Sequence, residues 1–230
     1  RIADAIWDFA ELGFREVRSA KIQADYLEEQ GFRVTREAGG IPTAFVAEWG
    51  DGGPYIGFLG EYDALAGVSQ EVSAERQPRE DGGPGHGCGH NLLGTAAMGA
   101  AVALKQALME KNLPGTVRYY GCPAEELLAG KVYMAREELF SDLDIAITWH
   151  PGSMNTVRLG SGTGLNSAKF QFFGKTAHAA GDPHNGRSAL DAVELMNVGA
   201  NYLREHVIKD ATIHYVITSG GGQPNVVPSF

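Results

Sequence analysis

Three side chains that can bind a metal or react with a substrate lie within the seven residues "GHGCGHN" at 85–91. His86, Cys88 and His90 alternate with glycine, which allows a tight backbone that points alternate side chains the same way. Three interpretations are open: a metal site, a redox thiol, or a glycine-rich turn that carries histidines. The second cysteine, Cys122, does not form a C-x-x-C motif with the first, which argues against the redox thiol.

Further polar side chains follow three predicted strands. These strands and side chains are 55–60 with Glu61 and Asp63, 115–121 with Glu125 and Glu126, and 144–150 with His150. Because ligands of open α/β sheets bind beyond the carboxyl ends of the strands, we expect these side chains to meet at one sheet edge. Cys88 and His90 directly precede a long predicted helix, and we expect them to lie near the side chains that follow the three strands. A mixed set of thiol, imidazole and carboxylate is typical of Zn²⁺ or a similar divalent ion, so the sequence predicts a metal site.

The adjacent residues Glu125 and Glu126 are predicted to have different roles. Neighbouring side chains on an extended backbone point in opposite directions. One carboxylate can therefore bind metal while the other faces the substrate as a general base, as metal-assisted hydrolysis requires. Taken singly, each signal has a plainer interpretation. The glutamates equally suit the first turn of a solvated helix, His86 suits a structural role, Cys122 a core position, and His150 a turn.

The elements that must position these side chains alternate between helix and strand. Helices are predicted over 2–10, 19–30, 92–111 and 130–138, and strands over 32–37, 43–49, 55–60, 115–121 and 144–150. This alternation indicates an α/β domain over residues 1–160 with a mostly parallel, open sheet. Residues 67–87 hold few large apolar side chains and are predicted to form a long irregular loop, which is usually functional or mobile.

The pattern changes after about residue 160. The predicted elements are a strand at 165–174, a helix at 186–206, a strand at 211–218, and a further strand that starts within 219–230. This order is typical of the first part of a small α+β domain, here 161–230. The chain has no initiator Met and stops inside a predicted strand, so we expect a fragment of a longer protein. His178 in this part would, taken alone, be an ordinary loop residue.

The composition is that of an ordinary globular protein, with 43% hydrophobic and 20% charged residues. A net charge of −9 makes nucleic acid and anionic membranes poor partners. The most apolar window, 92–109, contains Thr95 and Lys105, which favours a buried helix over a membrane span. The N-terminus lacks the apolar core of a signal peptide. With only two cysteines, a reduced, cytoplasmic location is expected.

Five ordered motifs resemble the metallopeptidase-20 superfamily of amidohydrolases. They are "GHGCGHN", "GCPAEE", "AITWHPG", "GKTAHAA" and "GGGQPNVVP". The Cys-containing subfamily D is the most similar group. Within it, "LGEYDALAGVSQ" and "RSALDAVELMNVGANYLREH" look most like the aminobenzoyl-glutamate utilization branch. The resemblance covers essentially the whole chain, and it implies a catalytic domain followed by a satellite domain that mediates dimerisation.

The resemblance implies roles at the metal for several residues of this sequence. The family's ligands correspond to Cys88, His90, Glu126 and His150, with the cysteine as the thiolate that replaces a bridging aspartate. Glu125 corresponds to the general base. Two divalent ions per subunit, Zn or Mn, are implied for the full-length protein. The family's last ligand histidine, near the end of a chain roughly twice as long, is absent from these residues, as is the second half of the satellite domain.

Three more residues receive roles from the resemblance. Asp63 corresponds to an acid that supports a metal ligand, His178 to a histidine that polarises the scissile carbonyl in a neighbouring subunit, and Asn225 to a residue near the substrate. The implied activity is hydrolysis of an N-acyl or N-aroyl amino acid, with p-aminobenzoyl-glutamate as the best candidate. A homodimer or a heteromer with a related subunit is implied. The alternatives are a dipeptidase of the same superfamily and a non-catalytic partner subunit.

Overall fold

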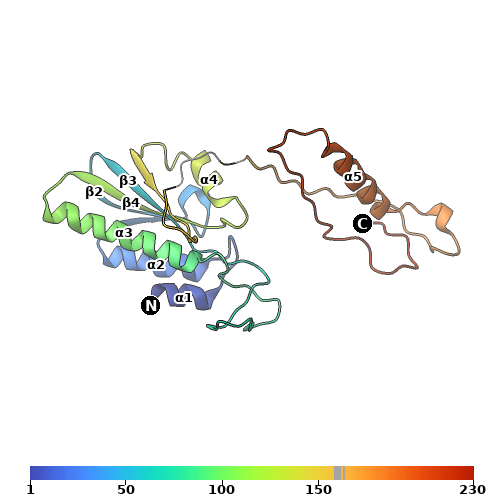
Figure 1. The fold of residues 1–230 in the computed structure, drawn as a ribbon, viewed down its shortest axis with the longest axis horizontal. Coiled ribbons are helices and arrows are strands. Elements are labelled where there is room, and N and C mark those ends of the chain that lie inside the picture. The colour runs from blue at the N-terminus through green and yellow to red at the C-terminus, as the bar shows by residue number, and fades with distance from the viewer. Residues whose placement is uncertain (158–161, 163) are drawn as a thin grey trace. The chain divides into compact units, whose positions relative to one another are not determined.

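The computed structural model describes residues 1–157, 162 and 164–230 (Figure 1). These residues form two compact units, Arg1–Asn155 and Thr156–Phe230. The domain boundary that the sequence predicts, between 160 and 161, falls on residues outside the described part. The first unit carries the predicted metal site, and the second carries His178 and Asn225.

The first unit contains the helices and strands that its patterning predicts. In its described residues these are α1 (Ile2–Phe9), β1 (Arg33–Arg36), β2 (Phe45–Asp51), β3 (Tyr55–Glu61), β4 (Gly115–Cys122), β5 (Ile145–Ile147), α2 (Val17–Glu29), α3 (His90–Glu110), α4 (Gly130–Arg136) and the 3-10 turn η1 (Ala38–Gly40). The strand β5 is shorter than predicted because the chain leaves the sheet before Trp149 and His150. The loop predicted over 67–87 contains no helix or strand.

The five strands form one sheet in the order β1-β2-β4-β3-β5. The strand β3 runs parallel to both β4 and β5, whereas β1 pairs with β2, and β2 with β4, in antiparallel fashion. The sheet is therefore mixed, which corrects the mostly parallel sheet predicted from the sequence. The reason lies in the connections. A short turn joins β1 to β2 and reverses the chain, while β3 reaches β4 through the long crossover helix α3.

Neighbouring side chains of the central strand β4 face opposite layers of the unit. Tyr119 packs into a core with Leu27 of α2 and Met98 of α3, whereas Tyr120 packs into a second core with Met134 of α4. This follows from the period of two along a strand. The helices α1, α2 and α3 accordingly cover one face of the sheet, and α4 covers the other (Figure 1).

The helix α3 is, by length and composition, apolar enough to cross a membrane, and no other helix of the described residues is. Four of its residues, Ala97, Met98, Ala101 and Val102, are buried in the core with the sheet. The helix is thus packed within the unit, as the polar residues in its sequence predicted.

Gly94 sets how closely α3 approaches the sheet. A Cβ at this position would lie 2.4 Å from the carbonyl oxygen of Glu61, at the end of β3. Any side chain here would push the first turn of α3 away from the strand. Since His90 is the first residue of α3, this close approach brings its ring to the edge where β3 ends.

Among its described residues, the second unit contains one long helix, α5 (Ala189–Leu203), close to the helix predicted at 186–206. Ser188 caps it, because the side-chain oxygen accepts a hydrogen bond of 3.1 Å from the backbone N–H of Asp191. A 3-10 turn, η2 (Pro183–Asn185), precedes it.

The strands predicted for the second unit do not form within its described residues. Its strand-like pairing consists of single bridges, Lys175 with Arg187 and His178 with Val226. The three expected strands are thus not seen among the described residues of this unit, and the small α+β domain stays a prediction. High strand propensity does not make a strand by itself, because the backbone groups need a neighbouring strand along their length.

Candidate metal centre

The carboxyl ends of the parallel strands meet at one sheet edge. Glu61 ends β3 and lies in register with Cys122, which ends β4. Glu125 follows β4, and His150 follows β5, which runs parallel to β3. The first turn of α3 brings His90 to the same edge. The predicted convergence of polar side chains is confirmed, because the strand order places all three strand ends side by side.

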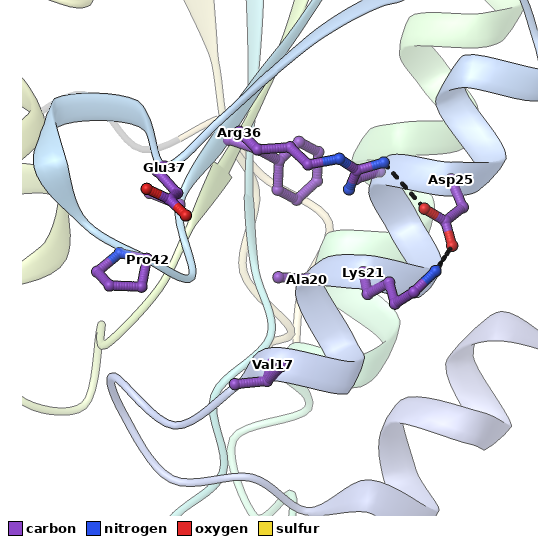
Figure 2. Close-up of a pocket in the computed structure, with 10 residues that line it drawn as sticks. Val17, Ala20, Lys21, Asp25, Arg36, Glu37 and Pro42 are labelled. Carbon is purple, nitrogen blue, oxygen red and sulfur yellow. Dashed lines mark hydrogen bonds and ion pairs between the residues drawn. The ribbon is translucent and has the colours of Figure 1, made fainter.

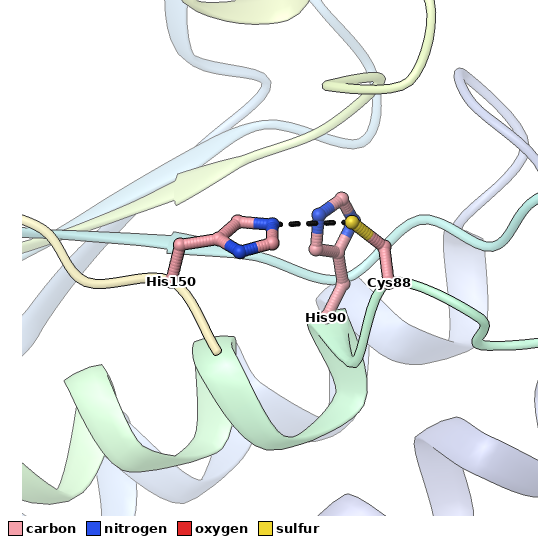
Figure 3. Close-up of side chains that lie close together, drawn as sticks. All are labelled: Cys88, His90 and His150. Atoms are coloured by element: carbon pink, nitrogen blue, oxygen red, sulfur yellow. Dashed lines mark hydrogen bonds between the residues drawn. The ribbon is translucent and has the colours of Figure 1, made fainter. Parts of the chain in front are cut away.

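Cys88, His90 and His150 form a first group of possible metal ligands, with one ligand atom each within 4.8 Å of the others (Figure 3). The sulfur of Cys88 lies 3.1 Å from Nε2 of His150. Nδ1 of His150 lies 3.0 Å from the carbonyl oxygen of Pro151 and donates to it. This bond places the ring proton on Nδ1, so that the lone pair of Nε2 faces the Cys88 sulfur and is available to a metal, which is how metal-binding histidines are usually oriented.

Glu61, His90 and Glu125 form a second group, which shares His90 with the first. Nδ1 of His90 lies 3.0 Å from a carboxylate oxygen of Asp63 and 3.1 Å from its carbonyl oxygen. Nε2 lies 3.1 Å from Oε2 of Glu61 and 3.6 Å from Oε2 of Glu125. The Asp63 carboxylate thus fixes the ring so that Nε2 faces the candidate site, a geometry that suits its predicted supporting role.

Glu126, a predicted ligand, stands slightly apart from both groups. Its Oε1 lies 4.0 Å from Nδ1 of His90, and its backbone N–H donates a 2.9 Å bond to the Asp63 carboxylate. The side chain lies near Cys88, on whose pKa it acts. The structure therefore places Glu125, rather than Glu126, against the free nitrogen of His90. The base role of Glu125 and the ligand role of Glu126 stay predictions.

The charges at this edge fit a divalent cation. Oε2 of Glu61, Nε2 of His90 and Oε1 of Glu126 are buried and have no hydrogen-bond partner in the described part of the chain. Burial, together with the carboxylates of Glu126, Glu125 and Glu61, raises the pKa of the Cys88 thiol to about 11. Such crowding of acceptors and a protonated thiol is costly by itself. A divalent ion would pair the orphaned atoms and displace the thiol proton.

Two other ionisable groups respond to the same crowding. Burial raises the pKa of Glu125, and the nearby Glu61 carboxylate raises it further. Burial alone would lower the pKa of His90, but the carboxylates of Asp63 and Glu61 outweigh it and give a net increase. A carboxyl with a raised pKa is the kind of group that can take and return a proton during catalysis.

The two predicted site residues of the second unit lie on adjacent segments. The backbone N–H of Ala179 donates a 3.0 Å bond to the carbonyl of Asn225. Nδ1 of His178 accepts bonds of 3.2 and 3.0 Å from the backbone N–H groups of Ala180 and Gly181. The ring proton is therefore assigned to Nε2, which can donate a hydrogen bond. The roles of His178 and Asn225 stay predictions.

His86 and Cys122, for which the sequence also allowed a structural role, lie in structural surroundings. Nε2 of His86 lies 3.0 Å from the carbonyl oxygen of Ile6, and the ring is buried. Cys122 is fully buried in the core beside Tyr120, and neither it nor Cys88 forms a disulfide. His86 therefore contacts the backbone of α1 and Cys122 the core, whereas Cys88 and His90 belong to the ligand groups.

A cavity of about 350 Å³ lies elsewhere in the first unit, between α2 and the strands β1 and β2 (Figure 2). The Asp25 carboxylate pairs with Lys21 on the same helix, and it pairs with Arg36 of β1 at 2.9 Å (Figure 2). No residue that lines this cavity belongs to the two ligand groups. The candidate chemistry is therefore at the strand ends and not in this cavity.

Sequence patterning did not single out two residues that matter at the site, Lys131 and Glu16, and it placed Glu61 at this edge without giving it an individual role. One signal was present for Glu61, since it alternates with Asp63 and alternate strand residues share a face. No local signal marks Lys131, which pairs with the Glu61 carboxylate across 70 positions of sequence. The same holds for Glu16, whose contact is 108 positions away.

Glu16 holds the turn that carries the two glutamates. It is fully buried, and its carboxylate accepts a 2.8 Å bond from the backbone N–H of Ala124. Ala124 has a left-handed backbone, with φ of 54°, directly before Glu125. A non-glycine residue keeps this conformation only where its surroundings fix it. Burial also raises the pKa of Glu16.

We expect Glu16→Ala to lower the free energy of unfolding of the first unit by about 2–4 kcal/mol, because it leaves a buried N–H unpaired and a cavity. Glu16→Gln keeps an acceptor oxygen for Ala124 and should retain most of the stability. Urea unfolding followed by tryptophan fluorescence measures this selectively, since Trp7, Trp49 and Trp149 all lie in the first unit. Equal losses in both variants would show that the acceptor oxygen is not what matters.

Comparison with known proteins gives the family. Residues 57–228 match the family described as Peptidase family M20/M25/M40, and the chain belongs to it. The chain is 53% identical over 232 residues to a subunit of the p-aminobenzoyl-glutamate hydrolase of Escherichia coli (strain K12), covering 98% of this chain and 47% of that protein. It is 31% identical over 241 residues to the Xaa-Arg dipeptidase of Mus musculus, covering 100% and 52%. The chain spans about half the length of these relatives.

Solved structures show the same fold. The YXEP protein of Bacillus subtilis, described as a dinuclear metal binding peptidase of the M20 family, matches with a TM-score of 0.53 and 28% identity over 64% of this chain and 41% of that one. An aminobenzoyl-glutamate utilization protein from Klebsiella pneumoniae matches with a TM-score of 0.60 and 23% identity over 99% and 64%. The resemblance found in the sequence motifs is thereby confirmed at the level of the family.

Proposed function

We propose that the protein containing this chain is a metal-dependent amidohydrolase that cleaves the amide bond of an N-acyl or N-aroyl amino acid. The observation that carries this proposal is the pair of ligand groups that share His90 at the carboxyl edge of the sheet. The substrate we favour is p-aminobenzoyl-glutamate or a close analogue. The name of the relative from Escherichia coli, at 53% identity, supports that choice.

Two divalent ions, Zn or Mn, are proposed to bind here in the full-length protein. The proposed ligands are Cys88, His90, Glu126 and His150. The thiolate and imidazoles favour Zn²⁺, while the carboxylates leave room for Mn²⁺. The dinuclear description of the neighbour from Bacillus subtilis supports the number of ions. When bound, such ions lower the pKa of a water molecule and polarise the scissile carbonyl.

The residues of this chain would move the protons. Glu125 takes a proton from the attacking water and later gives it to the nitrogen of the leaving amine, a dual use that its raised pKa supports. His178 is proposed to reach the active site of a neighbouring subunit and to donate its Nε2–H to the carbonyl oxygen as negative charge develops there. Asp63 holds the ring of His90 in the orientation that binding requires. Asn225 is proposed to contact the substrate.

The second unit is proposed to assemble the protein, either as a homodimer or with a related subunit. Large apolar side chains of its described residues are exposed, Phe173 at 75% and Leu195 at 73% among them. Apolar surface of this kind is typical of an interface. The relative from Escherichia coli is itself named as a subunit. A cytoplasmic location remains part of the proposal.

The function is tested with the complete polypeptide that contains this chain, incubated separately with p-aminobenzoyl-glutamate and with a dipeptide that ends in arginine. We expect release of p-aminobenzoate, loss of this activity with a chelator, and recovery with Zn²⁺ or Mn²⁺. Cleavage of the dipeptide alone would favour the dipeptidase alternative, to which the relative from Mus musculus points. Metal binding without turnover of either substrate would favour a non-catalytic subunit.

A further inference from the structure

Glu61 is a buried carboxylate, 6% exposed, whose two oxygens face different partners. Oε1 pairs with the ammonium group of Lys131. Oε2 lies 3.1 Å from Nε2 of His90. In the described part of the chain, neither Oε2 nor that nitrogen has a hydrogen-bond partner. When His90 is neutral with its proton on Nδ1, these two buried acceptor atoms face each other without a hydrogen bond, which leaves both desolvated and unpaired.

The separations at this point are close to those of ligands around one cation. Oxygen and nitrogen ligands lie about 2.0–2.2 Å from Zn²⁺, so two of them on a tetrahedron are about 3.3–3.6 Å apart. Nε2 of His90 lies 3.6 Å from Glu125, at the upper end of this range, and 3.1 Å from Glu61, slightly below its lower end. The orientation agrees with the distances, because Asp63 occupies the other nitrogen of His90 and turns Nε2 toward these carboxylates.

We propose that Glu61 is a ligand of the metal centre through Oε2, and that Lys131 is the residue that positions it. This inference rests on the proposed function, since it assigns a residue to the same metal-dependent site. A carboxylate that binds metal with one oxygen usually has the other oxygen held by a second residue. Lys131, at the start of α4, holds Oε1 in this way. Its positive charge also offsets one of the carboxylates crowded at the site.

The competing explanation is that Glu61 serves only as the counter-charge of Lys131. The two explanations differ in a double variant. If Glu61 is only a counter-charge, Glu61→Gln leaves an unpaired ammonium that repels metal, and the further change Lys131→Met should restore binding. If Glu61 is a ligand, removing Lys131 as well cannot restore the missing ligand atom. The double variant therefore separates coordination from charge balance.

The experiment uses the complete polypeptide, stripped of metal by a chelator and titrated with Co²⁺, with the visible spectrum and the number of ions bound as readouts. For Glu61→Gln we expect an affinity for one ion lower by a factor of at least about 100, with an altered spectrum and no recovery in the double variant. Lys131→Met alone should weaken binding by about 10–100-fold, as the loss of an outer partner does. If Glu61→Gln fails to fold, Glu61→Asp replaces it in the experiment. Aspartate keeps the charge but its shorter side chain withdraws the carboxylate, so metal binding should again be weaker.

The matched control is Glu48→Gln. Glu48 is a partly buried carboxylate of the same sheet that pairs with Arg118 at 2.6 Å, away from both ligand groups. The Glu48→Gln variant should bind Co²⁺ with the same affinity as the unmodified protein. Unchanged Co²⁺ affinity in Glu61→Gln, or full recovery in the double variant, would overturn the ligand role. If Cys88→Ala loses metal while Glu61→Gln does not, the ligand role of Glu61 is wrong but the proposed function stands. If the unmodified protein binds no Co²⁺, both the ligand role and the proposed function are wrong.

Discussion

Glu125→Gln is expected to lower kcat of the complete protein by a factor of about 10²–10⁴ while leaving its bound metal unchanged, since that is the usual contribution of a general base. Glutamine has the same size and an acceptor oxygen, so the turn after β4 should keep its conformation. It lacks the ability to take a proton from water and to return it to the leaving amine. Activity and metal content, measured on the same preparation, test both parts of the expectation.

The pH dependence provides a second test of the same residue. Burial and the Glu61 carboxylate raise the pKa of Glu125 above its ordinary value of 4.5. Only the ionised carboxylate can accept a proton, so the rate should fall as the pH falls through this raised pKa. In Glu125→Gln, the residual rate should lose that acidic limb of the profile.

Two variants serve as controls for Glu125→Gln. Glu137→Gln changes an exposed glutamate at the end of α4 and should be as active as the unmodified protein. Glu126→Gln should lose metal as well as activity, if Glu126 is the ligand of the pair. Substantial kcat in Glu125→Gln would show that the base has been assigned to the wrong residue. Loss of metal there would indicate that Glu125 is a ligand, as its 3.6 Å approach to His90 allows.

Cys88→Ala is expected to remove most of the bound metal from the complete protein purified without added metal. The sulfur of Cys88 lies 3.1 Å from Nε2 of His150, and both atoms belong to the first ligand group. Near two Zn or Mn per chain in the unmodified protein, falling sharply in the variant, would support a metal site at "GHGCGHN". Elemental analysis measures the content directly.

The affinity of this site should rise with pH. Without a cation, burial and the neighbouring carboxylates raise the pKa of the Cys88 thiol to about 11. Metal must therefore displace a proton to bind the thiolate, and the displacement becomes easier as the proton concentration falls. In Cys88→Ala this contribution to the pH dependence should disappear, together with the high affinity.

Cys122→Ala is the matched control, because the chain offers a second cysteine with a different environment. Cys122 is fully buried, and burial raises the pKa of its thiol to about 12. It packs in the core under α4 and belongs to neither ligand group. The variant should keep its metal. Equal metal content in Cys88→Ala and Cys122→Ala would favour the alternative interpretation of "GHGCGHN" as a glycine-rich turn that binds no metal.

Local pattern was enough to determine the elements of the first unit. The buried runs at β3 and β4 and the long apolar helix α3 formed where periodicity predicted them, because each element buries its own face. The meeting of Cys88, His90 and His150 followed from one topological rule, that the ends of parallel strands share an edge. Neighbouring parallel strands β3, β4 and β5 satisfy that rule here.

Only the tertiary structure decided what depends on distant partners. The pairing of Glu61 with Lys131 and the bond from Ala124 to Glu16 join positions with no shared periodicity. The mixed sheet depends on which strand β2 pairs with, and the nitrogen that His90 presents depends on Asp63. Among the described residues of the second unit the predicted strands are not formed, since a strand needs a pairing neighbour that propensity cannot supply. Sequence thus determined that Cys88, His90 and His150 gather at one edge, whereas packing determined how they are oriented and which distant residues support them.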